Sequence, residues 1–175
     1  MYYLLIFLLI SLNYSDKKLS SKPKKENAIQ LKELFTLKDK DGFYQRASAS
    51  TSENGMTAVL DAGNKSIHVF DKNGKHLRVF GEEGNGPGEL SRPFRIFTSK
   101  DRIYVREDMR VNCYDFTGKH IRDYSLMVAG SVGTPMIMDN HLAVSFRGNS
   151  KFLYVVFDDE GNQIEAVDNK TYEQP

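Results

Sequence analysis

The stretch AVLDAGNKSIHVFDKNGKHLRVFGEEGNGPGELSRP, residues 58–93, decides the fold of this 175-residue chain. Short runs rich in β-branched and aromatic residues alternate with turn segments, and a glycine-rich loop follows them. This pattern predicts antiparallel strands joined by tight turns. The apolar runs lie at 58–60, 67–70 and 77–80, and the turns lie at 61–65 and 71–74.

The same unit recurs twice further along the chain. An aromatic residue followed by a turn that begins with aspartate and ends with glycine occupies 70–74, 114–118 and 157–161, so the turn glycines are 44 and 43 residues apart. A repeat of about 40–45 residues built from four strands is typical of a β-propeller blade. The sequence therefore predicts an all-β fold, an open and partial β-propeller of about three four-stranded antiparallel blades.

The first repeat resembles an NHL repeat, and its glycine-rich loop, Gly86-Pro87-Gly88-Glu89-Leu90, resembles the secreted bacterial 6-bladed β-propeller family. The resemblance covers about residues 31–167 and is strongest in the middle. The second repeat departs from the pattern, because Arg106 stands where Asp61 would place an acid. The third keeps only the strand pattern and the turn at 158–161. The NHL resemblance is carried by Asp61-x-x-Asn64-Lys65-x-Ile67-x-x-Phe70-Asp71-x-x-Gly74, Gly81-x-x-Gly84 and Pro93.

Charge and cysteine content exclude several classes of function. The chain has 24 basic and 23 acidic residues, a balance that gives no support to a nucleic-acid partner. Its single cysteine, Cys113, cannot form an internal disulfide or a cysteine-based metal cluster. Cys113 occupies the same place in its repeat as Val69 and Val156, so we predict a buried core position.

The N-terminal residues indicate export. Residues 2–12, YYLLIFLLISL, form an uncharged apolar run. A membrane span needs about 20 such residues, whereas this length suits the apolar core of a secretory signal peptide. We therefore predict that residues 1–13 are a signal peptide or, alternatively, an uncleaved N-terminal anchor. Either interpretation predicts a periplasmic, cell-surface or secreted protein.

Residues 14–27 differ in composition from the rest of the chain. They contain five lysines, several serines and Pro23, and they offer little apolar surface to bury. We predict a flexible linker, with attraction to an anionic membrane surface as the alternative.

The partial propeller is predicted to occupy residues 28–175. Residues 29–37 fit both a strand and a short helix, and in a propeller residues 31–37 would form an entering strand. The first blade is predicted at about 47–81. Strands of the second are predicted near 94–98, 103–105, 111–114 and 121–124, and strands of the third near 136–138, 142–146, 152–157 and 164–167.

About three and a half repeats do not close a ring, since propellers typically have 4–8 blades and the resembled family has six. Two explanations remain open. The chain is a truncated gene product, which is the preferred interpretation, or copies of it self-associate to complete the propeller.

The loop at 84–88 has the glycine content of a phosphate-binding loop, but it lacks the other requirements. Such loops need backbone donors and a helix N-terminus. Pro87 removes a donor, and Glu82, Glu83 and Glu89 surround the loop with negative charge. We therefore predict a blade-to-blade connection in which glycines supply positive φ.

Catalytic signatures are not found in the sequence. The four histidines have no metal-ligand spacing, and there is no nucleophile elbow. We predict no catalytic residue, no metal and no cofactor.

The expected blade topology places the loops between second and third strands on the same face as the inter-blade loops. Binding sites concentrate on such loops, because a rigid scaffold holds them. We predict that any partner binds this face, with a solvated rim of mixed charge as the alternative. The candidate binding residues are Asp61, Asn64, Lys65, Asn85, Arg92, Arg106, Asp108, Arg110 and Arg147.

These observations favour an exported, non-catalytic binding or scaffold module that contacts a protein, peptide or glycan. The alternative is the remnant of a metal-dependent propeller hydrolase or lyase, similar to gluconolactonases or amidating lyases. In those enzymes acidic, amide or histidine side chains on inner strands hold the metal. The inner segments here, 94–97 and 135–138, carry apolar and basic side chains. A signalling sensor domain is the third hypothesis.

Overall fold

The computed structural model describes residues 33, 35–36, 47–126, 131–138, 141–147 and 151–170. The predicted signal peptide or anchor at 1–13 and the predicted linker at 14–27 lie outside these residues. The chain divides into two units, residues 1–33 and 34–175, and every described strand belongs to the second unit.

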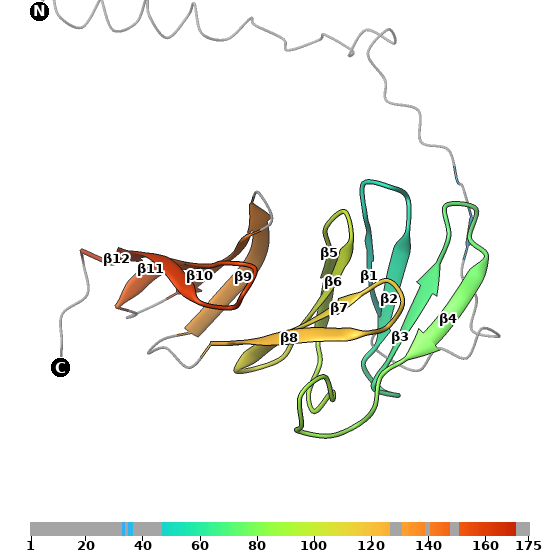
Figure 1. Cartoon of the computed structure of the whole chain (residues 1–175), viewed down its shortest axis with the longest axis horizontal. Helices are drawn as coiled ribbons and strands as arrows, with labels where there is room; N and C mark the ends of the chain where they lie inside the picture. The colour runs from blue at the N-terminus through green and yellow to red at the C-terminus, as the bar shows by residue number, and fades with distance from the viewer. Residues whose placement is uncertain are drawn as a thin grey trace, which may run out of the picture. The chain divides into compact units, whose positions relative to one another are not determined.

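The described residues form three four-stranded antiparallel sheets (Figure 1). Within each sheet the strands follow the order of the chain, so each sheet is a blade made of consecutive hairpins. The predicted all-β, partial propeller is thereby confirmed. The first sheet contains β1 (Ala47–Thr51), β2 (Thr57–Asp61), β3 (Ser66–Phe70) and β4 (His76–Phe80). The second contains β5 (Arg95–Thr98), β6 (Arg102–Arg106), β7 (Arg110–Asp115) and β8 (His120–Ser125). The third contains β9 (Ser131–Met138), β10 (His141–Arg147), β11 (Phe152–Phe157) and β12 (Gln163–Asp168).

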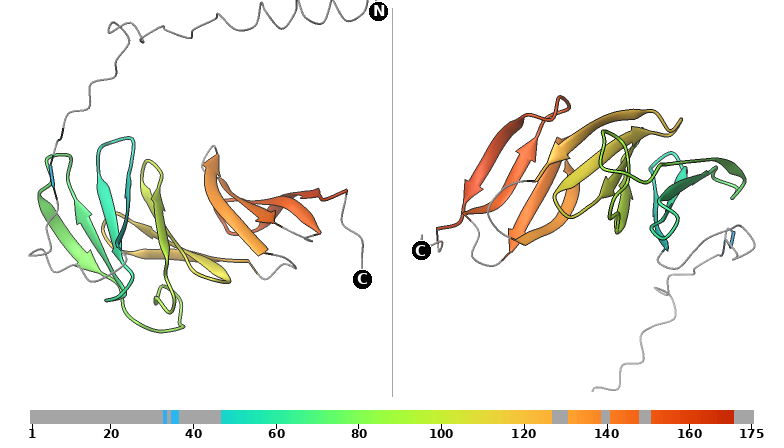
Figure 2. Two further views of the ribbon diagram at one scale, coloured as in Figure 1. Left: turned by 180° about the vertical axis from the view of Figure 1, so that it is seen from behind. Right: turned by 90° about the horizontal axis from the view of Figure 1, so that it is seen from below.

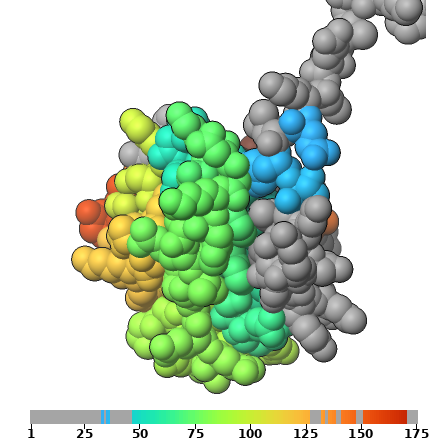
Figure 3. All heavy atoms as spheres, turned by 90° about the vertical axis from the view of Figure 1, so that its right-hand side faces the viewer, coloured from blue at the N-terminus to red at the C-terminus, as the bar shows by residue number. Residues whose placement is uncertain are grey.

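The entering strand predicted at 31–37 is not found in the part of it that the structure describes. Glu33, Phe35 and Thr36 lie outside any strand. The ring of Phe35 packs against the β3–β4 turn instead, where a Cβ atom added to Gly74 would lie 2.6 Å from Phe35 Cγ. Gly74 also has φ +80°, so both its conformation and its neighbour require glycine. Figure 3 shows this side of the molecule, with strands of the first sheet in cyan and green.

The three repeated turns are held by the aspartate that begins each of them. In the first, Asp71 Oδ1 accepts hydrogen bonds from the amides of Asn73 at 2.8 Å and Lys75 at 2.9 Å. Asp115 and Asp158 accept the corresponding bonds in the turns β7–β8 and β11–β12. The turn repeat in the sequence therefore reflects one local hydrogen-bonding device used three times.

Consecutive sheets are joined by two apolar clusters. The first cluster joins the first and second sheets and includes Leu60, Ile67, Ile103 and Val105. The second joins the second and third sheets and includes Cys113, whose predicted burial is confirmed. The middle blade lies between the other two sheets (Figure 2). Because sheets pack on both of its sides, its central strands β6 and β7 are almost wholly buried.

The outward face of the third sheet differs from the packed faces. Five of its large apolar side chains are exposed, and all of them except Ile164 line a groove of about 300 Å³. Self-association through such a face stays a prediction. Among the described residues there is no helix long and apolar enough to span a membrane. The exposed apolar residues of this sheet are Met136, Met138, Leu153, Tyr154 and Ile164.

We predict that the core of the third sheet depends on β10 more than on β11. Leu142 is 0% exposed, whereas Leu153 is 47% exposed. Leu142→Ala removes buried methyl groups and leaves a cavity, so it should lower the free energy of unfolding by about 2–5 kcal/mol. Leu153→Ala, the matched control, should lower it by much less. Urea unfolding measures both, and equal losses would contradict the assignment of the core.

A second prediction concerns acid stability. The amides of Lys75 and Asn73 lower the pKa of Asp71 below its ordinary value. The stability that Asp71 contributes is therefore present above its unfolded pKa of about 3.9 and is lost as the pH falls through the lower folded pKa.

Asp71→Asn keeps an acceptor oxygen but cannot titrate, so its stability should fall less steeply than that of the unmodified chain below about pH 4. Asp159→Asn, which changes an exposed aspartate of the third turn, is the control. The measurement is the urea midpoint across the acid range. Parallel curves for Asp71→Asn and the unmodified chain would refute the prediction.

Candidate functional site

The glycine-rich loop between β4 and β5, residues 81–94, is held by side chains of β7. Arg110 Nη1 donates to the carbonyl oxygens of Asn85 and Gly86, at 3.1 Å each. Arg110 Nη2 donates to the carbonyl oxygen of Glu89 at 2.7 Å, and Asn112 Nδ2 donates to the same oxygen at 3.1 Å. The guanidinium of Arg110 is therefore committed to the loop backbone.

Tyr114 completes this row of alternate β7 residues. Its hydroxyl donates to the carbonyl oxygen of Gly88 at 2.8 Å. Gly88 has φ +73°, and a Cβ atom there would lie 2.7 Å from His120 Cγ. The loop also closes on itself, because Glu89 Oε2 accepts from the Gly86 amide at 2.7 Å. The loop is thus a blade-to-blade connection, as predicted, and its motif serves docking on the next sheet.

Glu107 fixes the other half of the loop. Its carboxylate is buried, and Oε1 accepts from the amides of Ser91 at 2.6 Å and Arg92 at 2.9 Å. Its Oε2 pairs with Arg110 Nε. One acid and one base of the β6–β7 segment thereby hold both ends of the connection. Charge-assisted hydrogen bonds of this kind are stronger than neutral ones.

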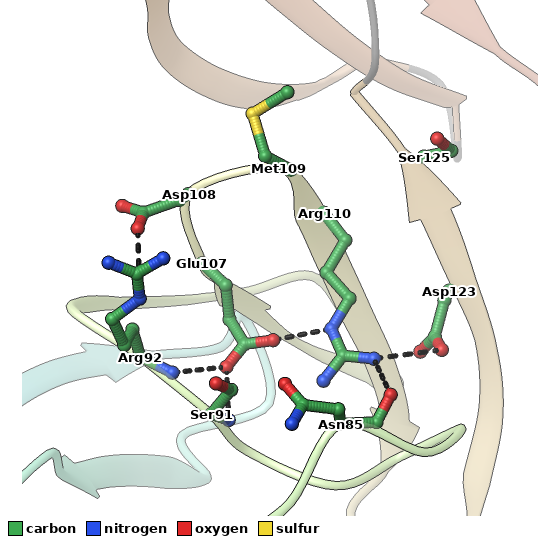
Figure 4. Close-up of a pocket in the computed structure, with 9 residues that line it drawn as sticks. All are labelled: Asn85, Ser91, Arg92, Glu107, Asp108, Met109, Arg110, Asp123 and Ser125. Atoms are coloured by element: carbon green, nitrogen blue, oxygen red, sulfur yellow. Dashed lines mark hydrogen bonds and ion pairs between the residues drawn. The ribbon is translucent and has the colours of Figure 1, made fainter.

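A groove of about 390 Å³ lies beside this clamp (Figure 4). Its exposed rim carries an ion pair, with Arg92 Nε 3.3 Å from Asp108 Oδ2 and side chains 80% and 52% exposed. Met109 is also exposed. The groove is lined by Asn85, Ser91, Arg92, Glu107, Asp108, Met109, Arg110, Asp123 and Ser125.

The far wall of the groove comes from β8. Asp123 Oδ2 lies 3.8 Å from Arg110 Nη1, and Asp123 Oδ1 lies 2.8 Å from His120 Nε2. The groove thus combines both signs of charge, two serines and one exposed thioether. That combination suits contacts with polar surfaces or chains more than a closed small-molecule site.

Three of the predicted binding residues lie instead in the β2–β3 turn. Asp61 Oδ1 accepts from the amides of Gly63 and Asn64 at 3.1 Å each, and Lys65 Nζ donates to the carbonyl oxygen of Ala62 at 3.1 Å. This turn neighbours the start of the glycine-rich loop, because a Cβ at Gly81 would lie 2.6 Å from the Lys65 carbonyl oxygen. The end of the sheets that carries this turn, the β6–β7 loop and the connection 81–94 is called the loop face below.

Two further predicted residues, Arg106 and Arg147, line a separate cavity of about 260 Å³. Arg106 is buried, and burial lowers the pKa of its guanidinium, opposed by the nearby charges of Asp108 and Glu107. The structure thus divides the predicted residues into three groups: the groove, the β2–β3 turn and this cavity. The remaining lining residues of the cavity are Phe94, Arg95, Val132, Gly133 and Pro135.

The candidate residues predicted from the sequence omitted three charged residues that line these hollows. Glu107 and Asp123 line the groove, and Arg95 lines the cavity. Arg95 could have been found, because antiparallel pairing places it directly opposite Arg106. Asp123 lies in a strand and carried no such signal.

Residues able to hold a metal do not come together in the described part of the chain. No three histidine, cysteine or acidic side chains there are close enough to bind an ion. Burial raises the pKa of the Cys113 thiol to about 12, so the thiol stays protonated at neutral pH.

Comparison with known proteins agrees with this geometry. A family model described as "6-bladed beta-propeller" matches residues 45–171. The chain belongs to this family. RING finger protein nhl-1 of Caenorhabditis elegans is 40% identical to this propeller over 53 residues, which are 30% of this chain and 5% of that protein. The resemblance to NHL repeats therefore has a counterpart in a curated relative.

Solved structures resemble the propeller in fold. A Bacteroides fragilis protein that carries the name "Putative exported protein" has a TM-score of 0.53 and 21% identity, over 83% of this chain and 42% of its own. The computationally designed Ika4 protein has a TM-score of 0.53 and 18% identity, over 82% of this chain and 84% of its own. The propeller thus spans less than half the length of the Bacteroides protein.

We predict that Arg110 is a structural clamp and Arg92 is not. Arg110→Met removes charge-assisted bonds to the loop and leaves the buried Glu107 with fewer partners, so it should cost about 2–3 kcal/mol or more. Arg92→Met breaks an exposed ion pair and should cost about 1 kcal/mol or less. Urea unfolding measures both effects. Amide hydrogen exchange at Leu90 does so too, because this amide donates to the carbonyl oxygen of Glu82 at 2.7 Å within the loop. Equal loss of protection in the two variants would contradict the assignment.

Proposed function

We propose that this propeller is an exported, non-catalytic binding or scaffold module that contacts a protein, peptide or glycan through its loop face. The groove beside Arg110 carries the proposal. Its floor is fixed by the hydrogen bonds of Glu107 and Arg110, whereas Arg92, Asp108 and Met109 on its rim are exposed. Because the backbone that carries these groups is already held in place, a partner that binds has to order only their side chains.

The shape and chemistry of the groove support a macromolecular ligand. The groove is open at the surface and presents a cation, an anion and a thioether within one stretch of the β6–β7 loop and the adjoining connection. Interfaces of this mixed kind are typical of transient protein and glycan recognition.

Export is supported by two observations. Residues 2–12 have the length and composition of the apolar core of a signal peptide. The Bacteroides fragilis structure that shares the fold carries the name "Putative exported protein".

The proposal is tested by binding of the purified chain to glycan and peptide arrays. Arg92→Ala combined with Asp108→Ala removes one cation and one anion from the groove rim. If the groove is the contact surface, the affinity for array ligands should fall about tenfold or more, because central interface residues cost over 1 kcal/mol when truncated.

Lys72→Ala combined with Asp159→Ala is the matched control, since it removes the same two charges from turns at the opposite ends of the strands. This variant should bind as the unmodified chain does. Loss of binding in the control alone, or the absence of any bound ligand, would contradict the proposed function.

A further inference from the structure

The last residue of the second strand occupies equivalent positions in the three sheets. It is Asp61 in β2, Arg106 in β6 and Arg147 in β10. Strand register confirms the equivalence, since these residues pair with the first residues of β1, β5 and β9. An acid in the first blade is thus replaced by arginine in the next two.

In the first blade this position stabilises its own turn. Asp61 is buried, and its two carboxylate oxygens accept from the amides of Gly63 and Asn64 and from Asn64 Nδ2. Arginine has no acceptor and cannot make these bonds. Turn formation therefore does not explain why arginine stands here in the second and third blades.

Burying Arg106 has a cost that its described neighbours offset only in part. Its side chain is 3% exposed, and Nε has no hydrogen-bond partner among the described residues. Its Nη1 lies 3.5 Å from the carbonyl oxygen of Arg110, at the limit of a hydrogen bond, and its guanidinium lies 5.2 Å from the ring of Phe94. Arg95 stands directly opposite on β5, and like charges in this relation are destabilising.

Three cations line the cavity, and none of the described residues that line it carries a carboxylate. Arg95, Arg106 and Arg147 all line it, and the other lining residues are apolar or glycine. The nearest acids in sequence are engaged elsewhere, because Glu107 holds the loop backbone and Asp108 pairs with Arg92. Guanidinium groups match the geometry of planar and tetrahedral oxyanions, and an anion here would satisfy Arg106 and relieve the repulsion.

We propose that this cavity is an anion subsite of the loop face, which binds a carboxylate, phosphate or sulfate group of an acidic ligand. This inference rests on the proposed binding function and specifies the chemistry of the partner. The cavity volume of about 260 Å³ admits one such group with the sugar or side chain that carries it.

Isothermal titration at constant ionic strength tests the subsite, with the purified full chain and three separate probes: inorganic phosphate, inorganic sulfate and glucuronate. Glucose is the neutral control. The three arms distinguish the sources of the oxyanion. At least one anion should bind at millimolar concentration or tighter, while glucose does not.

Arg95→Gln and Arg147→Gln change exposed side chains and avoid the folding cost of altering Arg106. Each should weaken binding of the preferred anion about tenfold or more, the loss expected for a hydrogen bond to a charged group. Arg78→Gln removes the same charge from an exposed arginine of β4, outside both the groove and the cavity, and should leave anion binding unchanged. An equal effect of all three variants would indicate nonspecific attraction and overturn the subsite, as would failure of every anion to bind.

The outcomes separate this inference from the proposed function. If array ligands still bind at the groove rim but no small anion binds, the subsite fails and the binding module stands. If anions bind in the cavity but the changes at Arg92 and Asp108 leave the affinity for array ligands unaltered, the groove proposal fails and the anion subsite stands.

Discussion

The structure depends on burial of both faces of the middle sheet. Strands β6 and β7 have apolar side chains directed to neighbouring blades on either side, so no single blade can bury its own core. Consecutive sheets must therefore pack against one another, which is the constraint common to repeat architectures. The connecting loop is fixed on the second sheet by hydrogen bonds from Arg110, Asn112 and Tyr114. The groove lies beside this loop and depends on its fixed position.

Much of the fold was predictable, because the signals that define it are local. A turn beginning with aspartate and ending with glycine forms from its own side-chain and backbone hydrogen bonds, so its recurrence fixed the repeat length and the hairpin positions. The continuous apolar run of β11 is typical of a strand packed on both faces, but Leu153 and Tyr154 within it are exposed in this structure. The segment 31–37 was less predictable, because Phe35 packs against the β3–β4 turn, which is distant in sequence. No local pattern in the segment indicates that contact.

The sequence predicted one binding face, and the structure brings four of the nine candidate residues, Asn85, Arg92, Asp108 and Arg110, to one groove. Their binding role stays a prediction. The sequence could not show that Arg110 donates to backbone carbonyl oxygens while Arg92 is exposed. Both are arginines in loop-face segments, and nothing in the sequence distinguishes a structural arginine from one that is free to contact a partner. The departure of Arg106 from the repeat was visible in the sequence, but its meaning required Arg95 on the opposite strand and Arg147 in the next blade.

The single cysteine offers an internal probe of blade separation. Cys113 lies in the cluster that joins the second and third sheets, and burial both shields its sulfur and raises its thiol pKa. An alkylating reagent at neutral pH can reach the thiolate only in molecules whose sheets have come apart there. The rate at which Cys113 is labelled in the unmodified chain therefore measures how often the second and third sheets separate. A ligand that binds to both blades would lower this rate.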